Sequence, residues 1–276
     1  MTQFLSLDAF IAAALREDVG TGDITTRCCV PEDAVSAGFF RAKERGVVAG
    51  LFILPRVFAQ LDAGVVATPL VKEGAEVNSG DIVATIEGNS RAILTGERVA
   101  LNILQRLSGV ATQTAAAVAA VAGTKTRIVD TRKTTPGLRE LEKYAVRTGG
   151  GVNHRFGLSD GILIKDNHIK ASGGITAAIT SARKNAPHTL KIEVEAETLE
   201  QVAEALDARA DVIMLDNMTT QLMAESVKLI AGRALTEASG NMGERDLREV
   251  ADTGVDFISI GGLTHSVRAL DISLKF

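Results

Sequence analysis

Hydrophobic positions in the first hundred residues follow two different periods. The apolar residues nearest the start recur at the spacing of a helix that buries one face: Leu7, Phe10, Ile11, Ala14 and Leu15. Short apolar runs follow, separated by turn sequences such as EGAEV and NSGD, and such runs are typical of β-strands. The expected strands are 38–42, 47–49, 65–70, 76–77 and 82–86, with a short helix over 54–61. This mixture predicts a small α+β domain with an antiparallel sheet.

One long helix is expected next, over RAILTGERVALNILQRL (91–107), and it would lead out of this domain. The stretch Leu107–Thr124 carries no charge, but Ser, Thr and Gly residues interrupt it. We therefore expect the end of the helix and a loop there, and not a segment that spans a membrane.

From Arg127 onward, short apolar strands alternate with helices, which is the pattern of βα units. The expected strands are 127–130, 161–164, 191–194, 211–215, 234–237 and 257–260. The expected helices are 138–147, 175–184, 199–206, 221–231 and 244–251. Because a complete α/β barrel needs eight strands, this pattern predicts an incomplete barrel of six or seven strands. An open doubly wound sheet is the alternative.

Composition narrows the kind of partner. The 276 residues are 46% hydrophobic and 23% charged, as in a globular protein, and the formal net charge of -4 argues against a nucleic-acid partner. The charge is uneven, since residues 127–170 carry a net charge of +4. A basic centre in an acidic chain indicates a small anionic ligand held in a pocket.

Cys28 and Cys29 are adjacent and have no metal-ligand spacing, so free thiols in a reducing compartment are expected. The start MTQFLSLDAF lacks the basic segment and apolar run of a signal peptide. Both features favour a cytoplasmic protein with no membrane partner.

Polar or glycine-rich residues follow each expected strand of the barrel. They are Thr131–Lys133, Lys165–His168, Glu195, Asp216, Ser239–Asn241 and Gly261–Gly262. The carboxyl ends of barrel strands meet at one face, where active sites form. A solvated loop explains any one of these charged residues, but it explains six such positions in register poorly.

Two groups of opposite charge stand out among these residues. The cationic group is Arg132, Lys133, His154, Arg155 and Lys165. Cations crowded together are costly to desolvate unless an anion joins them, so a dianion or a polyphosphate is the expected partner. The acidic group is Glu195 and Asp216, which would face a hydrated Mg²⁺ or ribose hydroxyls, with a salt bridge to Lys165 as the alternative.

A phosphate site is expected after the last two strands. Barrels often bind phosphate there through backbone N–H groups, and glycine lets the backbone approach closely. The candidate residues are Ser239, Gly240 and Asn241, and Gly261 and Gly262 with Thr264, His265 and Ser266 beside them. We find no convincing covalent nucleophile.

The motif TRKTTPGLRELEKYAVRTGGGVNHRFGLSDGILIKDNHI (131–169) resembles the signature of the quinolinate phosphoribosyltransferase family, also called nicotinate-nucleotide pyrophosphorylase (carboxylating). The resemblance covers nearly the whole chain in order. It continues through 17–26, 96–112, 192–195, 212–218, 237–241 and 254–266.

This resemblance implies a fold and a reaction. Quinolinate and phosphoribosyl pyrophosphate (PRPP) would give nicotinate mononucleotide, pyrophosphate and CO2, with Mg²⁺ required, in the synthesis of NAD. The implied fold is an N-terminal α/β sandwich domain (1–107) and an incomplete α/β barrel (108–266), with the tail 267–276 packing back on the first domain. The implied working unit is a homodimer.

The resemblance also implies roles, position by position. Quinolinate would contact Arg132, His154, Arg155 and Lys165, together with Arg98 from the partner subunit. Lys133 would lie near both ligands, with Thr134 beside it, and Glu195 and Asp216 would face the ribose and its Mg²⁺. The 5-phosphate would be held by Ser239, Gly240, Asn241, Ile260, Gly261 and Gly262, with His265 close by. Catalysis would depend on Lys133, Glu195 and Asp216. The departures are small: Asn241-Met242 follows Ser-Gly where many relatives have a second Gly, and Gly262 stands where Ala is common.

Three alternatives remain open. A paralogous phosphoribosyltransferase could act on a different carboxylated base, although a base with one carboxylate needs fewer cations. Residues 71–88 are similar to half of a biotinyl or lipoyl carrier motif, but the hairpin tip reads GNSR and lacks the lysine that such carriers need. A phosphate-binding barrel without activity would not require Glu195 and Asp216. We expect structural roles for His168 and His188.

Overall fold

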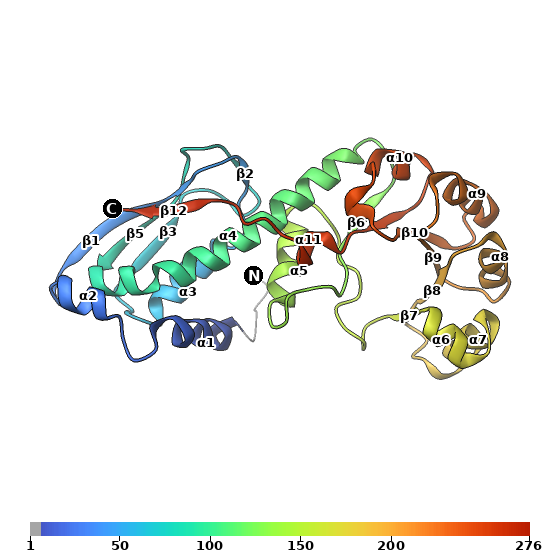
Figure 1. Ribbon diagram of the computed structural model, residues 1–276, viewed down its shortest axis with the longest axis horizontal. Coiled ribbons are helices and arrows are strands. Elements are labelled where there is room, and N and C mark those ends of the chain that lie inside the picture. The colour runs from blue at the N-terminus through green and yellow to red at the C-terminus, as the bar shows by residue number, and fades with distance from the viewer. Residues whose placement is uncertain (1–6) are drawn as a thin grey trace. The chain divides into compact units, whose positions relative to one another are not determined.

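The computed structural model describes residues 7–276, which fall into two compact units (Figure 1). The first unit contains residues up to 115, residues 136–149 and residues 267–276. The second contains residues 116–135 and 150–266. Each unit has its own sheet.

The first unit is built on a four-stranded antiparallel sheet in the order β12-β1-β5-β3. Its strands are β1 (Val35–Ala42), β3 (Val66–Pro69), β5 (Ile82–Asn89) and β12 (Ile272–Lys275). A short pair, β2 (Gly46–Val47) and β4 (Glu76–Val77), lies outside this sheet. Strand β12 pairs with β1 from Phe39↔Lys275 to Ala42↔Ile272, so the C-terminal strand completes the N-terminal sheet.

Helices α1 (Leu7–Val19), α2 (Ile24–Cys29) and α3 (Ile53–Ala59) belong to the same unit. The buried rings of Phe40 from β1 and Phe58 from α3 lie 6.4 Å apart, so α3 packs into the core beside the sheet. Helix α2 was not expected from the sequence. It begins because the Asp23 carboxylate accepts the Thr26 N–H at 2.9 Å and caps the first turn.

Helix α4 (Ser90–Ala120) is longer than the sequence predicts. The expectation that residues beyond 107 form a helix end and a loop is wrong. The hydroxyls of Thr112 and Thr114 donate to the carbonyls of Ser108 and Val110 at 2.7 and 2.8 Å, so these polar side chains are satisfied within the helix. Among the described residues, no helix is both long and apolar enough to cross a membrane.

Helix α5 (Arg139–Thr148) groups with the first unit, although residues 108–266 were expected to form one barrel domain. The carboxylate of Glu142 is fully buried and accepts from Arg106 of α4, with Nη2 at 2.6 Å and Nε at 2.8 Å. The ring of Tyr144 meets the ring of Phe52 edge-on at 5.1 Å. These contacts explain why α5 belongs to the first unit.

The second unit contains a six-stranded parallel sheet in the order β6-β11-β10-β9-β8-β7. Its strands are β6 (Arg127–Val129), β7 (Ile162–Ile164), β8 (Ile192–Ala196), β9 (Val212–Asp216), β10 (Leu235–Ser239) and β11 (Phe257–Ser259). From β7 to β11, each strand pairs with the next one in the chain, and β6 pairs with β11. This circular order confirms an incomplete six-stranded α/β barrel and excludes the doubly wound sheet, in which the order reverses at a switch point.

The barrel is open between β6 and β7, and the chain at 150–155 occupies part of this gap. Val152 forms a parallel bridge with Val129, and its N–H donates to the Ile128 carbonyl at 2.9 Å. The buried carboxylate of Asp130 then accepts the backbone N–H of His154 at 2.8 Å and the side-chain amide of Asn153 at 2.6 Å. A short segment that is not a full strand is therefore fixed beside β6.

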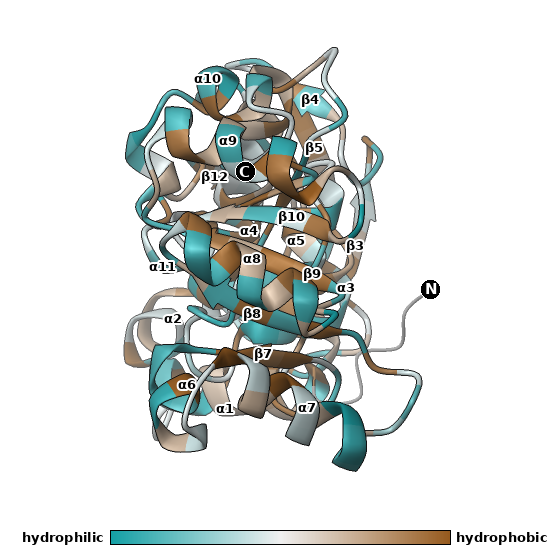
Figure 2. Cartoon of the chain, turned by 90° about the vertical axis from the view of Figure 1, so that its right-hand side faces the viewer, coloured by the Kyte–Doolittle hydropathy of each residue, from teal (hydrophilic) through white to brown (hydrophobic). Residues whose placement is uncertain are grey.

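Helices cover the outside of the barrel. They are α6 (Asp166–Ser172), α7 (Ile175–Asn185), α8 (Leu199–Asp207), α9 (Thr220–Ile230), α10 (Leu247–Asp252) and α11 (Gly262–His265), with one 3-10 turn at Met242–Glu244. Thr198, Thr219 and Asp246 cap α8, α9 and α10 by accepting backbone N–H groups of the first turn. In Figure 2, α7 and α8 show both apolar and polar bands, as expected for helices with one buried face.

Gly109 tests whether packing or helix propensity dominates in α4. Gly109→Ala should improve helix propensity by about 1 kcal/mol. However, the new Cβ would overlap the Arg268 carbonyl oxygen, and overpacking costs about 1 to 3 kcal/mol when the neighbour cannot move. We expect Gly109→Ala to lower the free energy of unfolding, measured by denaturant titration. Asn102→Ala, at an exposed position of the same helix, should raise it slightly, and a gain for both variants would contradict the packing argument.

Candidate functional site

A cavity of about 470 Å³ lies at the carboxyl ends of the barrel strands. It collects most of the residues that the sequence singled out: Arg132, Lys133, His154, Arg155, Lys165, Glu195, Asp216, Ser239, Gly240 and Asn241. These residues come from six separate segments of the second unit. The register of parallel strands brings them together, since consecutive strands all end at one face.

The remaining predicted residues lie beside this cavity or away from it. Thr134 is on the loop after β6, and its N–H donates to the Arg132 carbonyl at 2.9 Å. Ile260 is buried after the end of β11. Gly261 precedes α11, Gly262 begins it and His265 ends it. Arg98 is exposed on α4 in the first unit and is not among the described residues that line the cavity.

The loop after β6 is tied to α11. The Thr264 hydroxyl donates to the Lys133 carbonyl at 2.7 Å. A Cβ on Gly261 would lie 2.9 Å from Cδ of Lys133 and 3.1 Å from the ring of His265, so a larger residue would displace these side chains. The position of Lys133 therefore depends on the segment that the sequence associates with phosphate.

Arg132 and Arg155 place two guanidinium groups close together. Burial lowers the pKa of Arg155 below its ordinary value, and repulsion from Arg132 lowers it further. The side chain of Arg155 is held in place by a 3.0 Å hydrogen bond from Nη1 to the Gly161 carbonyl. Two such groups side by side form a ready site for a carboxylate or phosphate, because an anion would relieve their repulsion.

Lys165 and Glu195 form an ion pair across the cavity floor. The side chain of Glu195 is 13% exposed, whereas that of Lys165 is 46% exposed and reaches toward solvent. The salt bridge to Lys165 that the sequence left as an alternative is therefore present. Lys165 thus neutralises the charge of Glu195 and holds this carboxylate beside the cationic group.

Asp216 lies at the end of β9, and the next residue, Asn217, adopts the left-handed backbone conformation. The side-chain amide of Asn217 donates to Oδ2 of Asp216 at 2.8 Å, and Asn217 itself has a positive φ of 54°. Gly240, at the end of β10, has a φ of 94°, and a Cβ there would overlap the side-chain oxygen of Asn217. Glycine at 240 is therefore required for the strand-end loops to meet.

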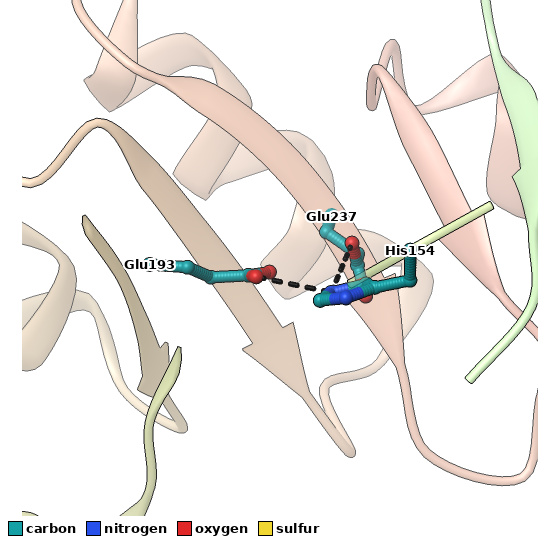
Figure 3. A group of neighbouring side chains, drawn as sticks. All are labelled: His154, Glu193 and Glu237. Carbon is teal, nitrogen blue, oxygen red and sulfur yellow. Dashed lines mark ion pairs between the residues drawn. The ribbon is translucent and has the colours of Figure 1, made fainter. Parts of the chain in front are cut away.

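His154 does not join the cationic group in the expected way. Its Nε2 lies 3.0 Å from Oε2 of Glu193 and 3.5 Å from Oε2 of Glu237, inside the barrel (Figure 3). Its Nδ1 accepts the backbone N–H of Arg155 at 2.7 Å, so Nδ1 carries no proton. The ring is then neutral, with the hydrogen on Nε2 directed at the carboxylates.

Sequence reasoning missed Glu193 and Glu237, which are almost completely buried. Burial and the neighbouring Glu193 raise the pKa of Glu237 to about 8, so Glu237 is protonated at neutral pH. Each residue stands two positions before a strand-end residue, Glu195 or Ser239, and side chains two positions apart point to the same side of a strand. An acid in the middle of an apolar parallel strand was the signal in the sequence.

Two further residue pairs had no assigned role. The Nδ1 of His168 accepts the Lys165 N–H at 2.9 Å and caps α6, which is a structural contact, whereas His188 is exposed between α7 and β8. Cys28 and Cys29 are both exposed free cysteines on α2, outside the barrel.

Comparison with known proteins covers nearly the whole chain. Residues 23–108 match the model of the quinolinate phosphoribosyl transferase N-terminal domain, and residues 110–275 match that of the C-terminal domain. A probable nicotinate-nucleotide pyrophosphorylase [carboxylating] of Bacillus subtilis is 49% identical over 258 residues, which cover 94% of this chain and 89% of that protein.

A second relative and a solved structure agree. The nicotinate-nucleotide pyrophosphorylase [carboxylating] of Mycobacterium leprae is 45% identical and covers 96% of this chain and 95% of that protein. The crystal structure of NadC from Streptococcus pyogenes, 45% identical, covers 100% of this chain and 98% of that one with a TM-score of 0.94. The chain therefore belongs to the quinolinate phosphoribosyltransferase family.

Proposed function

We propose that the protein transfers the phosphoribosyl group of PRPP to quinolinate with decarboxylation, giving nicotinate mononucleotide, pyrophosphate and CO2. It is a pentosyltransferase of NAD biosynthesis. The observation that carries the proposal is the meeting of four cations (Arg132, Lys133, Arg155 and Lys165) with Glu195 and Asp216 in one cavity, whose lining also includes Asp166, Glu197 and Glu237. A dianionic base and a polyphosphate ester match these two groups of charge.

Quinolinate has two adjacent carboxylates on a pyridine ring. Arg132 and Arg155 would bind them, since their neighbouring guanidinium groups offer forked donors for planar anions. Lys165 lines the same cavity and adds a third charge, already oriented by Glu195. A base with a single carboxylate would leave part of this cationic surface without a counter-charge, which favours quinolinate over the paralogous substrates.

The acids suit a magnesium ion that arrives with PRPP. Glu195 and Asp216 line the same cavity and offer only carboxylate oxygens, the ligand type that Mg²⁺ prefers. We assign these two residues to hold the ion, directly or through water. When bound, it would neutralise charge on the departing pyrophosphate.

The phosphate end of PRPP would lie against the glycine-rich strand ends. Gly240 lets the backbone after β10 turn where a side chain would collide with Asn217. Ser239, Asn241 and the segment from Ile260 to Gly262 surround the same end of the barrel, with His265 beside them. Backbone N–H groups in such turns bind phosphate oxygens well.

The protein's residues then act mainly by placement. The pyridine nitrogen attacks the anomeric carbon as the bond to pyrophosphate breaks, and positive charge develops on the sugar. Lys133, held by Thr264, lies where it can stabilise the leaving phosphates, and Glu195 and Asp216 face the developing positive charge. The quaternary ring nitrogen that results makes loss of the adjacent carboxylate easier.

A homodimer and a cytoplasmic location complete the proposal. The dimer rests on the family resemblance of Arg98, which is exposed on α4 and would reach quinolinate in the partner's site. The location rests on the two free cysteines, which suit a reducing compartment.

The choice of base gives the direct test. Purified protein with PRPP and Mg²⁺ should form nicotinate mononucleotide and pyrophosphate from quinolinate, and should form little or no product from nicotinate. The measurement is separation of the nucleotides by chromatography. Equal turnover of nicotinate would contradict the assignment and favour the paralogous reaction.

Arg132→Ala should weaken quinolinate binding by roughly 2 to 5 kcal/mol, because one partner of a desolvated charge pair is removed. Isothermal titration calorimetry with quinolinate measures this loss. The control is Arg248→Ala, which removes an exposed arginine on α10 and should leave the affinity unchanged. Unchanged affinity in Arg132→Ala would count against this role.

The double variant Glu195→Gln, Asp216→Asn should turn over at least roughly 100-fold more slowly at saturating substrates, because charge stabilisation at the reacting centre is lost. Steady-state kinetics with varied Mg²⁺ measures the change. Glu225→Gln, at an exposed site on α9, is the matched control. Wild-type turnover in the double variant would rule out the proposed acidic group.

A further inference from the structure

A second cavity of about 370 Å³ lies at the opposite, amino ends of the barrel strands. It is lined by residues that begin strands, such as Ile162, Val212 and Phe257, and by the exposed residues Asp160 and Lys191. Three residues line both this cavity and the carboxyl-end cavity: His154, Arg155 and Glu237. Titratable side chains therefore lie inside the barrel between the two cavities.

The cluster of His154, Glu193 and Glu237 is part of this group of side chains (Figure 3). One ligand atom from each lies within 4.8 Å of the others, as in a metal site. The histidine argues against a metal, because a ligating Nε2 must carry no proton, whereas Nδ1 already accepts the Arg155 N–H and leaves the ring's hydrogen on Nε2. The same geometry fits a hydrogen-bonded cluster in which the His154 ring and one of the two carboxyl groups carry protons.

Glu237 is the carboxylic acid of the cluster that lines both cavities, as the imidazole of His154 also does. It is 3% exposed, and its Oε1 has no hydrogen-bond partner within residues 7–276. The groups that face it are Glu193 from β8, His154 from the segment beside β6, and Ser259 from β11. Burial and the neighbouring Glu193 carboxyl make a negative charge at Glu237 unfavourable, so the pKa of Glu237 is raised and this carboxyl keeps its proton at neutral pH.

The proposed reaction needs a proton at the ring carbon that loses CO2. When the carboxylate next to the ring nitrogen leaves as CO2, the C–C bond breaks and its electron pair remains on the ring carbon. That carbon must gain a proton to give nicotinate mononucleotide. The guanidinium groups of the cavity are poor acids, and Lys165 is engaged by Glu195.

We infer that Glu237 supplies this proton from below the substrate cavity, with Glu193 and His154 as positioning residues. The inference rests on the proposed function. The O–H bond of Glu237 breaks, a C–H bond forms at the ring carbon, and the carboxylate left behind regains a proton from water through the amino-end cavity. A neutral buried carboxylic acid is a suitable donor for such a step.

The retained proton has a consequence for stability. The pKa of Glu237 rises from 4.5 to about 8 on folding, so the folded state binds more protons than the unfolded state between these values. The free energy of unfolding should therefore fall as pH rises through this window. Glu237→Gln mimics the protonated acid, so its denaturation midpoint should approach that of the wild type below pH 4.5 and exceed it above pH 8. Parallel curves for the two proteins would show that Glu237 is not protonated in the folded state.

Glu237→Gln also separates the two chemical steps. In single-turnover experiments with quinolinate and PRPP, pyrophosphate release should stay within about twofold of the wild type, because transfer does not use this proton. Formation of nicotinate mononucleotide should slow by roughly 100-fold, the scale of general acid catalysis, and quinolinate mononucleotide should accumulate. Glu237→Asp, which retains a carboxyl group, should restore part of the second step. Glu225→Gln is the matched control on the surface of α9.

Several outcomes would overturn the inference. The first is that Glu237→Gln releases pyrophosphate and forms nicotinate mononucleotide at the wild-type rates. The second is that both rates fall equally in a folded variant, which would show a purely structural role for Glu237. Stoichiometric binding of Zn²⁺ or Mn²⁺ that is lost in Glu193→Gln would make the cluster a metal site. If the Gln variant does not fold, the Asp variant decides, since slow decarboxylation with normal pyrophosphate release is expected there too. Failure of the wild type to convert quinolinate would remove the proposed function as well, whereas the variant results alone remove only this inference.

Discussion

One buried carboxylate fixes the segment that occupies part of the gap between β6 and β7, and the site depends on that contact. Asp130 is fully buried at the end of β6 and accepts from the backbone of His154 and the side chain of Asn153. These bonds hold an irregular segment where a barrel strand would otherwise pair. Because the segment is fixed, the next residue, Arg155, enters the carboxyl-end cavity and the His154 ring turns into the barrel. An irregular segment beside β6 thus supplies both Arg155 and His154 to the interior of the incomplete barrel.

Charge explains why so many ionisable groups tolerate one another in the cavity. Arg132 and Arg155 repel each other, and this repulsion lowers the pKa of Arg155. Lys165 is balanced by Glu195, and Asp216 is held by Asn217. Arg132 and Arg155 are the neighbouring guanidinium groups that the proposed dianionic base would meet. Such a site carries its electrostatic cost in the free state and recovers it when the anion binds.

The sequence predicted the barrel and its cavity because both follow from periodic patterns and from the positions of strand ends. It failed where distant contacts decide the outcome. Helix α4 continues past residue 107 because its threonine hydroxyls find carbonyls within the helix, and Gly109 fits against the C-terminal tail. Helix α5 belongs to the first unit because Glu142 pairs with Arg106, a contact between residues 36 positions apart. The direction of the His154 ring could not be foreseen, since it depends on two glutamates from other strands.

Glu193 and Glu237 connect the architecture with the chemistry. The pleat of a strand directs alternate side chains to one side, so Glu193 and Glu195 both face the barrel interior, one inside it and one at its mouth. The outer acid, Glu195, is partly exposed and forms an ion pair with Lys165. The inner acids have no cation as close, so one of the two retains a proton. The alternation of side chains along β8 and β10 thus places Glu195, paired with Lys165, at the barrel mouth, and Glu193 and Glu237 inside the barrel. Binding of the anionic substrates and the proposed proton transfer therefore depend on different acids.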